Sequence, residues 1–228
     1  MLDRFMDEKN RPICLLYMVR LTSFTSHLEY DMDEDLKNID LSKLSARNRI
    51  LKTAITLFNE VGVHSTGIDR IIAESGVAKM TFYNHFPSKN DLIVAYLDYR
   101  DTTQFDRLKK HTIEKTKNPR LQILGIFDAL EEWFLEADYR GCAFTKGLAD
   151  FGNAPESAAF QSVQNHFSKW LAFVAAPLRE LTTSKLLPAA QTQLMSLIIG
   201  SIMLASAGAG AQVARTNKKA AKLLLDVL

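Results

Sequence analysis

Five side chains suited to contact a nucleic acid lie together in a short run that ends before Pro87. Projected on a helix at about 100° per residue, this run has two different sides. One side carries Lys79, Met80, Tyr83 and Asn84, with Thr81 at its flank, whereas Ala78, Phe82 and Phe86 fall on the other. A cation, hydrogen-bonding groups and an apolar side chain able to meet a thymine methyl suit the major groove of DNA. We expect the second side to pack against neighbouring helices.

An amphipathic helix precedes this run. Its apolar residues recur at helical spacing, and they are Ile50, Ala54, Leu57, Phe58 and Val61. We expect the helix to run to about Glu60 and to stop at Gly62, since glycine commonly ends helices.

A second short helix should lie between this helix and the run before Pro87. Thr66 stands three residues before Asp69, as in a capping box, and predicts the start of that helix. It should end before Gly76, whose backbone freedom allows a tight turn into the helix Ala78–Phe86. The pair then forms a helix-turn-helix, and Ser88 to Asp91 cap a fourth helix. The alternative interpretation is an ordinary helical hairpin with a solvated face.

The rest of the chain alternates long apolar segments with short breaks and predicts an all-α fold. We expect helices over 120–137, 142–151, 191–211 and 218–228. One more should open at Asn153–Glu156, where Asn caps and Pro lies in the first turn, and should bend or end near Pro177. Three parts follow. They are a flexible N-terminal extension over 1–44, with Met18 and Met32 as alternative starts, a helix-turn-helix DNA-binding domain over 45–92, and an effector-binding and dimerisation domain over 93–228.

Large aromatic residues are frequent on the predicted C-terminal helices. In one interpretation they form the core. In the other, some of them line an apolar effector pocket between helices. The candidates for that pocket are Trp133, Phe134, Phe144, Phe151, Phe167 and Trp170.

Composition and spacing argue against several classes of protein. A net charge of +2 is too small to indicate nucleic-acid binding by itself. The two cysteines and five histidines show no metal-ligand spacing, so we expect no metal and no cofactor. Common hydrolase, metalloprotease and nucleotide-binding motifs are absent. An enzyme and a helical scaffold that binds only a protein partner remain the alternatives to a DNA-binding protein.

Two apolar segments have features of membrane or export signals. Residues 13–19 are not followed by a small-residue cleavage site, which argues against a signal peptide. Residues 186–214 carry no charge and are long enough to span a bilayer. Because that segment also contains polar residues and many Ala and Gly, we expect a buried helix of a cytoplasmic protein and no membrane partner.

The region from the first to the fourth predicted helix resembles the N-terminal signature of the TetR (tetracycline-repressor) family. The residues that carry the resemblance are Gly62, Val63, Thr66, Ile68, Ile71, Ala73, Gly76, Val77, Lys79, Thr81, Phe82, Tyr83, His85, Phe86, Lys89 and Leu92. Gly67 departs from the usual Ser or Thr, and Ile72 from the usual Ala. Further along, residues 139–144 with Asp150 and Phe151 resemble the GCxF segment of one subgroup.

This resemblance implies roles for particular residues. Lys79, Met80, Thr81, Tyr83 and Asn84 occupy recognition-helix positions. Tyr83 and His85 correspond to frequent phosphate contacts, and Thr66 and Lys89 to helix starts that touch phosphates.

The resemblance also implies partners. We expect a homodimer on a palindromic operator in double-stranded DNA. It should act as a repressor that a small, mostly apolar effector releases, and activation remains the alternative. The dimer should form through helices at about 160–181 and 190–211, with Gly200, Leu204, Gly208 and Ala211 on one close-packing side.

Overall fold

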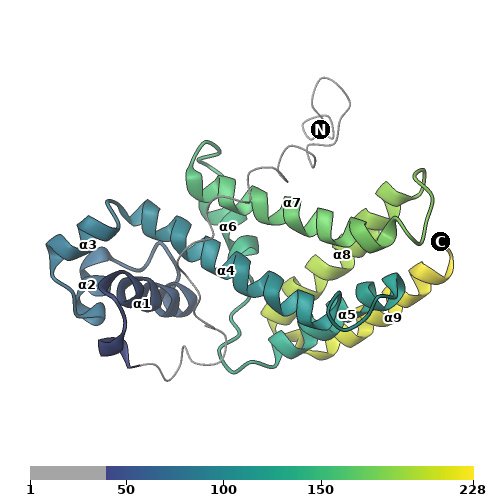
Figure 1. Cartoon of the computed structure of the whole chain (residues 1–228), viewed down its shortest axis with the longest axis horizontal. Helices are drawn as coiled ribbons and strands as arrows, with labels where there is room; N and C mark the ends of the chain where they lie inside the picture. Colours follow the sequence, from purple (N-terminus) through teal and green to yellow (C-terminus); the bar gives the residue numbers. More distant parts are fainter. Residues whose placement is uncertain (1–39) are drawn as a thin grey trace. The chain divides into compact units, whose positions relative to one another are not determined.

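The computed structural model describes residues 40–228, and this part of the chain is helical with no strand (Figure 1). The expectation for the N-terminal extension therefore lies almost entirely outside the described residues. The elements are a 3-10 turn at Leu41–Lys43, α1 Ala46–Val61, α2 Ile68–Ser75, α3 Lys79–His85, α4 Lys89–His111, α5 Pro119–Phe134, α6 Ala143–Phe151, α7 Ala158–Leu178, α8 Leu187–Leu204, a π-helical turn at Ala205–Ala209 and α9 Gln212–Asp226.

Helices α1, α2 and α3 form a small head whose core lies behind α3. Ser45 caps α1, and Gly62 ends it with a backbone φ of 91° that favours glycine. The predicted apolar stripe of α1 is buried except for Val61, which is 43% exposed. Phe82 of α3 is completely buried against this core. The local pattern therefore builds the head as predicted, because burial of one side of each short helix holds it in place.

The turn between α2 and α3 has the conformation that the sequence predicts. Gly76 adopts the left-handed region at φ 63° and ψ 34°, where side chains other than glycine are disfavoured. Ser88 and Asp91 then form a complete capping box at the start of α4. Both ends of α3 are thus fixed by local backbone chemistry.

The capping box predicted at Thr66 is wrong. The N-cap of α2 is Gly67, with no side-chain hydrogen bond. Instead, the Thr66 hydroxyl donates to the carbonyl of Gly62 at 2.8 Å. It therefore closes the turn that leaves α1, because a buried hydroxyl needs a partner and the backbone carbonyl supplies it.

Helix α4 belongs to both halves of the described region (Figure 1). Its first turns are buried against the head, where the Tyr96 ring meets Phe58 edge-on at 5.3 Å. Its second half packs on α5 and α7. The boundary expected near residue 92 falls inside this helix, so one continuous rod joins the head to the bundle.

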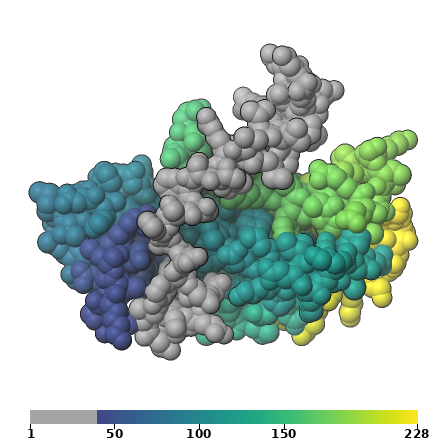
Figure 2. Space-filling view, in the orientation of Figure 1, coloured from purple at the N-terminus to yellow at the C-terminus, as the bar shows by residue number. Residues whose placement is uncertain are grey.

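Helices α5 to α9 form that bundle. Helix α9 lies along α5, held by ion pairs of Lys218 with Asp128 at 2.6 Å and of Arg215 with Glu131 at 2.6 Å. Helix α7 crosses α4, α5 and α8. In Figures 1 and 2, α2 and α3 lie at one end of the described region, and α8 and α9 lie near its other end.

One glycine allows α5 to approach the end of α4 closely. A Cβ atom on Gly125 would collide with the backbone carbonyl oxygen of His111. Gly125 is buried in the middle of α5, where glycine normally weakens a helix. Its presence is explained by this backbone contact, which seats α5 against α4.

Three predicted helix boundaries are corrected. Helix α7 begins at Ala158, because Ser157 accepts the hydrogen bond from the Phe160 amide and Asn153 caps nothing. Helix α8 covers Leu187–Leu204 rather than 191–211, since the chain turns at Gly208 with φ 97°. Helix α9 starts at Gln212, six residues before the predicted 218. Gly208 and Ala211 therefore do not continue the helix face of Gly200 and Leu204.

The segment Leu187–Ala209 is, within residues 40–228, the one helical segment long and apolar enough to cross a membrane. Core helices of water-soluble proteins have the same length and composition. Here Ile198 and Ile202 are buried in the bundle, as expected for a helix that contributes to a protein core.

Candidate functional site

The outer face of α3 presents the predicted set of side chains to solvent. Met80 is 72% exposed and Tyr83 is 37% exposed, while Phe82 and Phe86 on the opposite side are buried. The Tyr83 ring rests edge-on against Phe82 at 5.3 Å between centroids, and the residue keeps 37% of its surface exposed. The helix therefore combines a rigid apolar anchor with a polar surface.

The structure brings most of the other predicted contacts to this end of the molecule. Lys79, Asn84 and His85 are exposed and Thr81 is half-buried on α3. Lys89 is half-buried in the first turn of α4, and burial lowers the pKa of its ammonium. A phosphate at that helix start would restore a favourable environment for the charge.

Two residues of the predicted set have different positions from those expected. Thr66 has no exposed surface, so its side chain is not available to a phosphate. Ala78 is exposed, and the neighbouring Val77 fills the buried position instead. Both differences arise at the caps, where the chain leaves helical geometry and the 100° projection no longer applies.

Arg47 is a candidate contact that the sequence argument missed. It lies in the first turn of α1, with its guanidinium carbon 5.2 Å from the centre of the Phe86 ring. This cation–π contact holds a positive charge beside the C-terminal end of α3. The signal in the sequence is weak, since Arg47 simply precedes the buried Ile50 by one helical turn.

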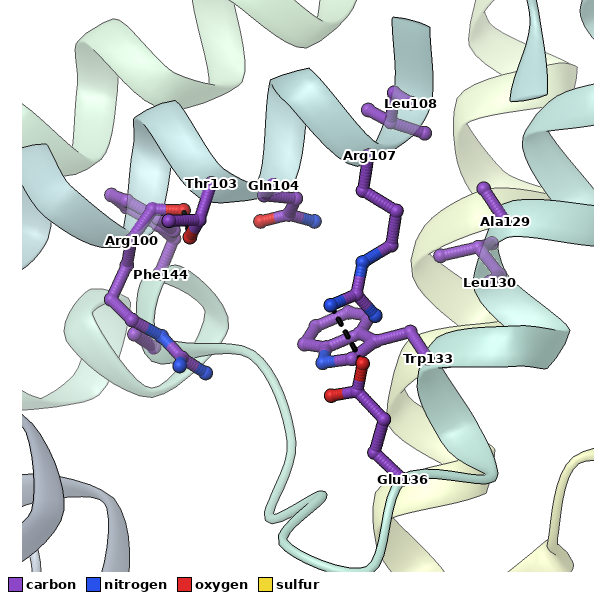
Figure 3. A pocket seen from close by; sticks show the side chains of 11 residues that line it. Arg100, Thr103, Gln104, Arg107, Leu108, Ala129, Leu130, Trp133, Glu136 and Phe144 are labelled. Atoms are coloured by element: carbon purple, nitrogen blue, oxygen red, sulfur yellow. Dashed lines mark hydrogen bonds and ion pairs between the residues drawn. The ribbon is translucent and has the colours of Figure 1, made fainter. Parts of the chain in front are cut away.

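A second candidate site is a cavity of about 50 Å³ between α4, α5 and α6 (Figure 3). Its lining residues are Arg100, Thr103, Gln104, Arg107, Leu108, Ala129, Leu130, Trp133, Glu136, Ala143 and Phe144. In Figure 3, Arg107 extends from α4 to Trp133 and Glu136, while Arg100 extends from the same helix beside Phe144 and Gln104 lies between the two arginines. The cavity therefore has one polar wall and one apolar wall.

Only some of the six predicted effector residues lie at this cavity. Trp133 and Phe144 line it. Phe151 lines a second, smaller cavity of about 30 Å³ between α1, α4 and α6. Phe134, Phe167 and Trp170 line neither of these two cavities. The polar residues of α4 were missed, although their spacing of three and four residues marks a common helix face.

A buried polar network lies behind Phe144. The imidazole of His166 stacks on the Phe144 ring at 3.5 Å, and its Nδ1 is 2.7 Å from a carboxylate oxygen of Asp101. Trp170 donates its indole N–H to Nε2 of His166 at 3.1 Å. Because an indole nitrogen can only donate, Nε2 must be the bare nitrogen and Nδ1 must carry the proton.

The protonation of this network follows from its surroundings. Burial lowers the pKa of His166 below 6.5, although Asp101 opposes the shift. Burial works against the charge of Asp101, but hydrogen bonds from His166 and Lys169 outweigh it and hold the pKa of Asp101 below 3.8. A neutral imidazole and an ionised carboxylate therefore coexist at neutral pH.

The cysteine and the histidines of the described residues do not form a reactive or metal-binding centre. Cys142 is buried, and burial raises the pKa of its thiol, which disfavours the reactive thiolate. Between residues 40 and 228 no cluster of three or more His, Cys, Asp or Glu side chains is placed to hold a metal ion.

Comparison with known proteins supports the assignment of the head. A family model described as "Bacterial regulatory proteins, tetR family" matches residues 50–96. YerO, an HTH-type transcriptional regulator of Bacillus subtilis (strain 168), is 32% identical over 78 residues, which cover 34% of this chain and 27% of YerO. FasR, an HTH-type transcriptional activator of Mycolicibacterium smegmatis, is 30% identical over 95 residues, or 42% of each chain. The chain thus matches less than half of the length of these curated relatives.

The likeness to a solved structure extends through the bundle. The crystal structure of SCO4454, a TetR-family transcriptional regulator from Streptomyces coelicolor, is similar with a TM-score of 0.74 and 29% identity, covering 79% of this chain and 94% of that chain. A helix-turn-helix head joined through one shared helix to a helical bundle defines the class of protein. The chain belongs to the TetR family of bacterial regulatory proteins. Its family and these relatives are transcriptional regulators, not enzymes.

Proposed function

We propose that this protein is a sequence-specific DNA-binding transcription regulator that places α3 in the major groove. The exposed outer face of α3, with Phe82 and Phe86 anchored behind it, is the observation that carries the proposal. Tyr83, Asn84 and Lys79 offer hydrogen bonds and charge to base edges and phosphates, and Met80 offers an apolar contact. Lys89 and Arg47 supply further positive charge at the rim.

A homodimer on a palindromic operator accounts for the apolar surface of the bundle. Only 28% of the 18-residue apolar window within Leu187–Ala209 is buried within one chain. Met203 and Leu204 of α8 and Leu171 of α7 are each more than 40% exposed, and apolar surface of this kind commonly marks an interface. A second copy that covers α7 and α8 would give two recognition helices related by a twofold axis, as a palindrome requires.

Effector control requires a physical link between the bundle and the head. Asn59 of α1 donates to the backbone carbonyl of Asp138 at 3.1 Å, in the turn that begins at the cavity residue Glu136. His64 lies 3.6 Å from the carboxylate of Asp150 in α6. An effector that binds the cavity better in a DNA-incompetent arrangement of this turn would release the operator.

Repression relieved by such an effector in the bacterial cytoplasm is the mode that we favour, because a dimer bound over a promoter blocks it without further contacts. Activation is the second candidate, favoured by the similarity to FasR, which is an HTH-type transcriptional activator. The two are distinguished by transcription in vitro from a template that carries the selected site, with and without the protein.

The direct test of the proposal is selection of binding sites from random DNA duplexes with the full chain, followed by footprinting of the selected sequence. We expect a palindromic site whose half-site centres are about 34–36 Å apart. Loss of the site in a Lys79→Ala, Tyr83→Ala double variant that keeps its circular dichroism spectrum would support contact through α3. Recovery of no common sequence would contradict the proposal and favour the scaffold alternative.

A further inference from the structure

The cavity of the bundle has a cationic wall that an apolar ligand would not use. Arg100, Gln104 and Arg107 lie on one face of α4, at spacings of four and three residues. Opposite them, Trp133, Leu130 and Phe144 form an apolar wall. Figure 3 shows Arg107 crossing from α4 to Trp133, with Gln104 one helical turn before it on the same helix.

Two hydrogen-bond donors on this wall are buried and unused. The Nη1 atom of Arg107 and the Nε2 atom of Gln104 have no solvent exposure and no hydrogen-bond partner. Arg107 uses its other terminal nitrogen, Nη2, in an ion pair with Glu136 at 2.7 Å. Buried donors are almost always paired in folded proteins, so two orphans on one cavity wall point to a missing acceptor.

The charges of the lining are also unbalanced. Arg100 and Arg107 contribute two positive charges, and Glu136 is the single acidic residue among the lining residues. No ion pair involves Arg100 within the described residues. One positive charge therefore remains uncompensated in a partly enclosed space, where it favours an anion.

We propose that the effector of this protein is a small organic monocarboxylate with an aromatic or apolar body. Its carboxylate accepts hydrogen bonds from Arg107 Nη1 and Gln104 Nε2, and its body lies against Trp133 and Phe144. This inference rests on the proposed function, because it names the ligand class for the same effector site. It replaces the mostly apolar ligand that the aromatic residues alone suggested.

Charge and planar shape favour a carboxylate over a phosphate ester. A single negative charge balances the one uncompensated cation, whereas a phosphate monoester carries up to two near neutral pH. The planar guanidinium also matches the planar carboxylate. The enclosed volume of about 50 Å³ has room for about four water molecules, which is enough for the carboxylate end of a ligand, so an attached ring would extend toward the open side of the cavity.

The test uses benzoate, with benzamide as its neutral analogue and phenyl phosphate as the dianionic one. Isothermal titration calorimetry on the full chain should show binding of benzoate at least tenfold tighter than of either analogue, because a hydrogen bond to a charged group is typically worth a factor of ten or more. Equal binding of benzamide would overturn the inference, and so would the absence of benzoate binding. Tighter binding of phenyl phosphate would assign the site to phosphates instead.

Two substitutions with opposite expected effects separate ligand contact from a structural role. Arg107→Met should reduce benzoate affinity about tenfold or more, whereas Glu136→Gln should increase it by releasing Arg107 and removing a negative charge. Lys110→Gln, an exposed cation at the end of the same helix, should leave affinity unchanged. A fold defect could mimic the loss but not the gain, so an unchanged or weaker affinity in Glu136→Gln would overturn the proposed contact.

Failure of this inference is distinguishable from failure of the proposed function. The site selection on random duplexes tests DNA binding without any ligand. If DNA binds and only neutral compounds bind the bundle, the regulator proposal stands and the carboxylate inference falls. If benzoate binds as expected but no DNA sequence is selected, the carboxylate site stands and the regulator proposal falls.

Discussion

Tyr83 and Lys79 illustrate how single side chains divide the work of DNA recognition. Tyr83 is braced by Phe82 and directed outward, so it is suited to a specific contact. Replacing it with Ala should weaken binding of the selected site by about 1–3 kcal/mol. Tyr83→Phe, which retains the ring, should separate the hydroxyl contribution from packing. Gel-shift titration checks both variants, and an unchanged affinity would remove Tyr83 from the interface.

Lys79 should act differently, through phosphate. Lys79→Ala should weaken binding to all sequences alike and reduce the slope of log affinity against log salt by about one. Lys110→Ala, which removes an exposed lysine of the bundle, serves as the matched control and should leave the slope unchanged. A Lys79 variant with altered sequence preference but an unchanged salt slope would instead indicate contact with a base.

His166 gives the fold a dependence on pH. Burial lowers its pKa in the folded state, so the neutral form stabilises the fold above the unfolded value of about 6.5. That stabilisation is lost as the pH falls through the lowered folded-state pKa, at up to about 1.4 kcal/mol per pH unit for this one proton. The pKa of Asp101 is also lowered, so its contribution is lost only at still lower pH.

Thermal unfolding between pH 8 and pH 5 measures this dependence. We expect the melting temperature of the natural chain to fall on acidification. His166→Gln should be less stable at pH 8 but should lose less stability on acidification, since it has no proton to gain. Parallel pH profiles of the two proteins would show that other groups control acid unfolding.

The exposure of single residues was predicted correctly within the regular helix α3 and wrongly where the chain leaves a helix. The exposed face of α3 follows from periodicity alone. Thr66 was misplaced because the same residue pattern serves a capping box or a turn, and only the path of the chain decides which. The cationic wall of the cavity was missed because its meaning depends on α5 packing across from α4, which spacing along α4 does not reveal.

At the scale of elements, Gly125 sets the distance between α4 and α5. Gly125→Ala improves helix propensity by about 1 kcal/mol, but the added Cβ meets the backbone carbonyl of His111. Overpacking of this kind typically costs about 1–3 kcal/mol, so we expect a net loss of stability in urea unfolding. Gly67→Ser is the comparison, because the N-cap of α2 has open space and serine is a preferred cap.

Helix ends were the least predictable feature of the bundle. Asn153 and Pro155 resemble a helix start, but Ser157 is a competing candidate and is the residue that caps α7. The sequence alone does not show which of two candidate capping residues of equal strength is used, so packing decides where the helix begins. Likewise, α8 was extended to residue 211 because its composition remains apolar, although the positive φ of Gly208 turns the chain.

At the scale of the whole molecule, the dimer should depend on α8. Leu204 is 52% exposed in a single chain, so Leu204→Arg should spare the monomer fold while placing a charge in the proposed interface. We expect monomers by light scattering and loss of operator binding. Leu121→Arg, at a leucine that is 53% exposed on α5, is the control and should remain dimeric. A dimeric Leu204 variant would place the interface on another surface.

The continuity of α4 has a mechanical consequence. At 1.5 Å per residue, about 22 Å of helix separates Leu92 in the head from Arg107 at the cavity. A tilt of only about 5° around the cavity end would carry the head through about 2 Å, by simple leverage along that length. In a dimer the opposed displacements of the two heads would add. The distance between the two recognition helices would then no longer match the fixed helical repeat of the DNA. A stiff rod of this kind converts a small rearrangement around a ring-sized molecule into a mismatch that two half-sites cannot both accommodate.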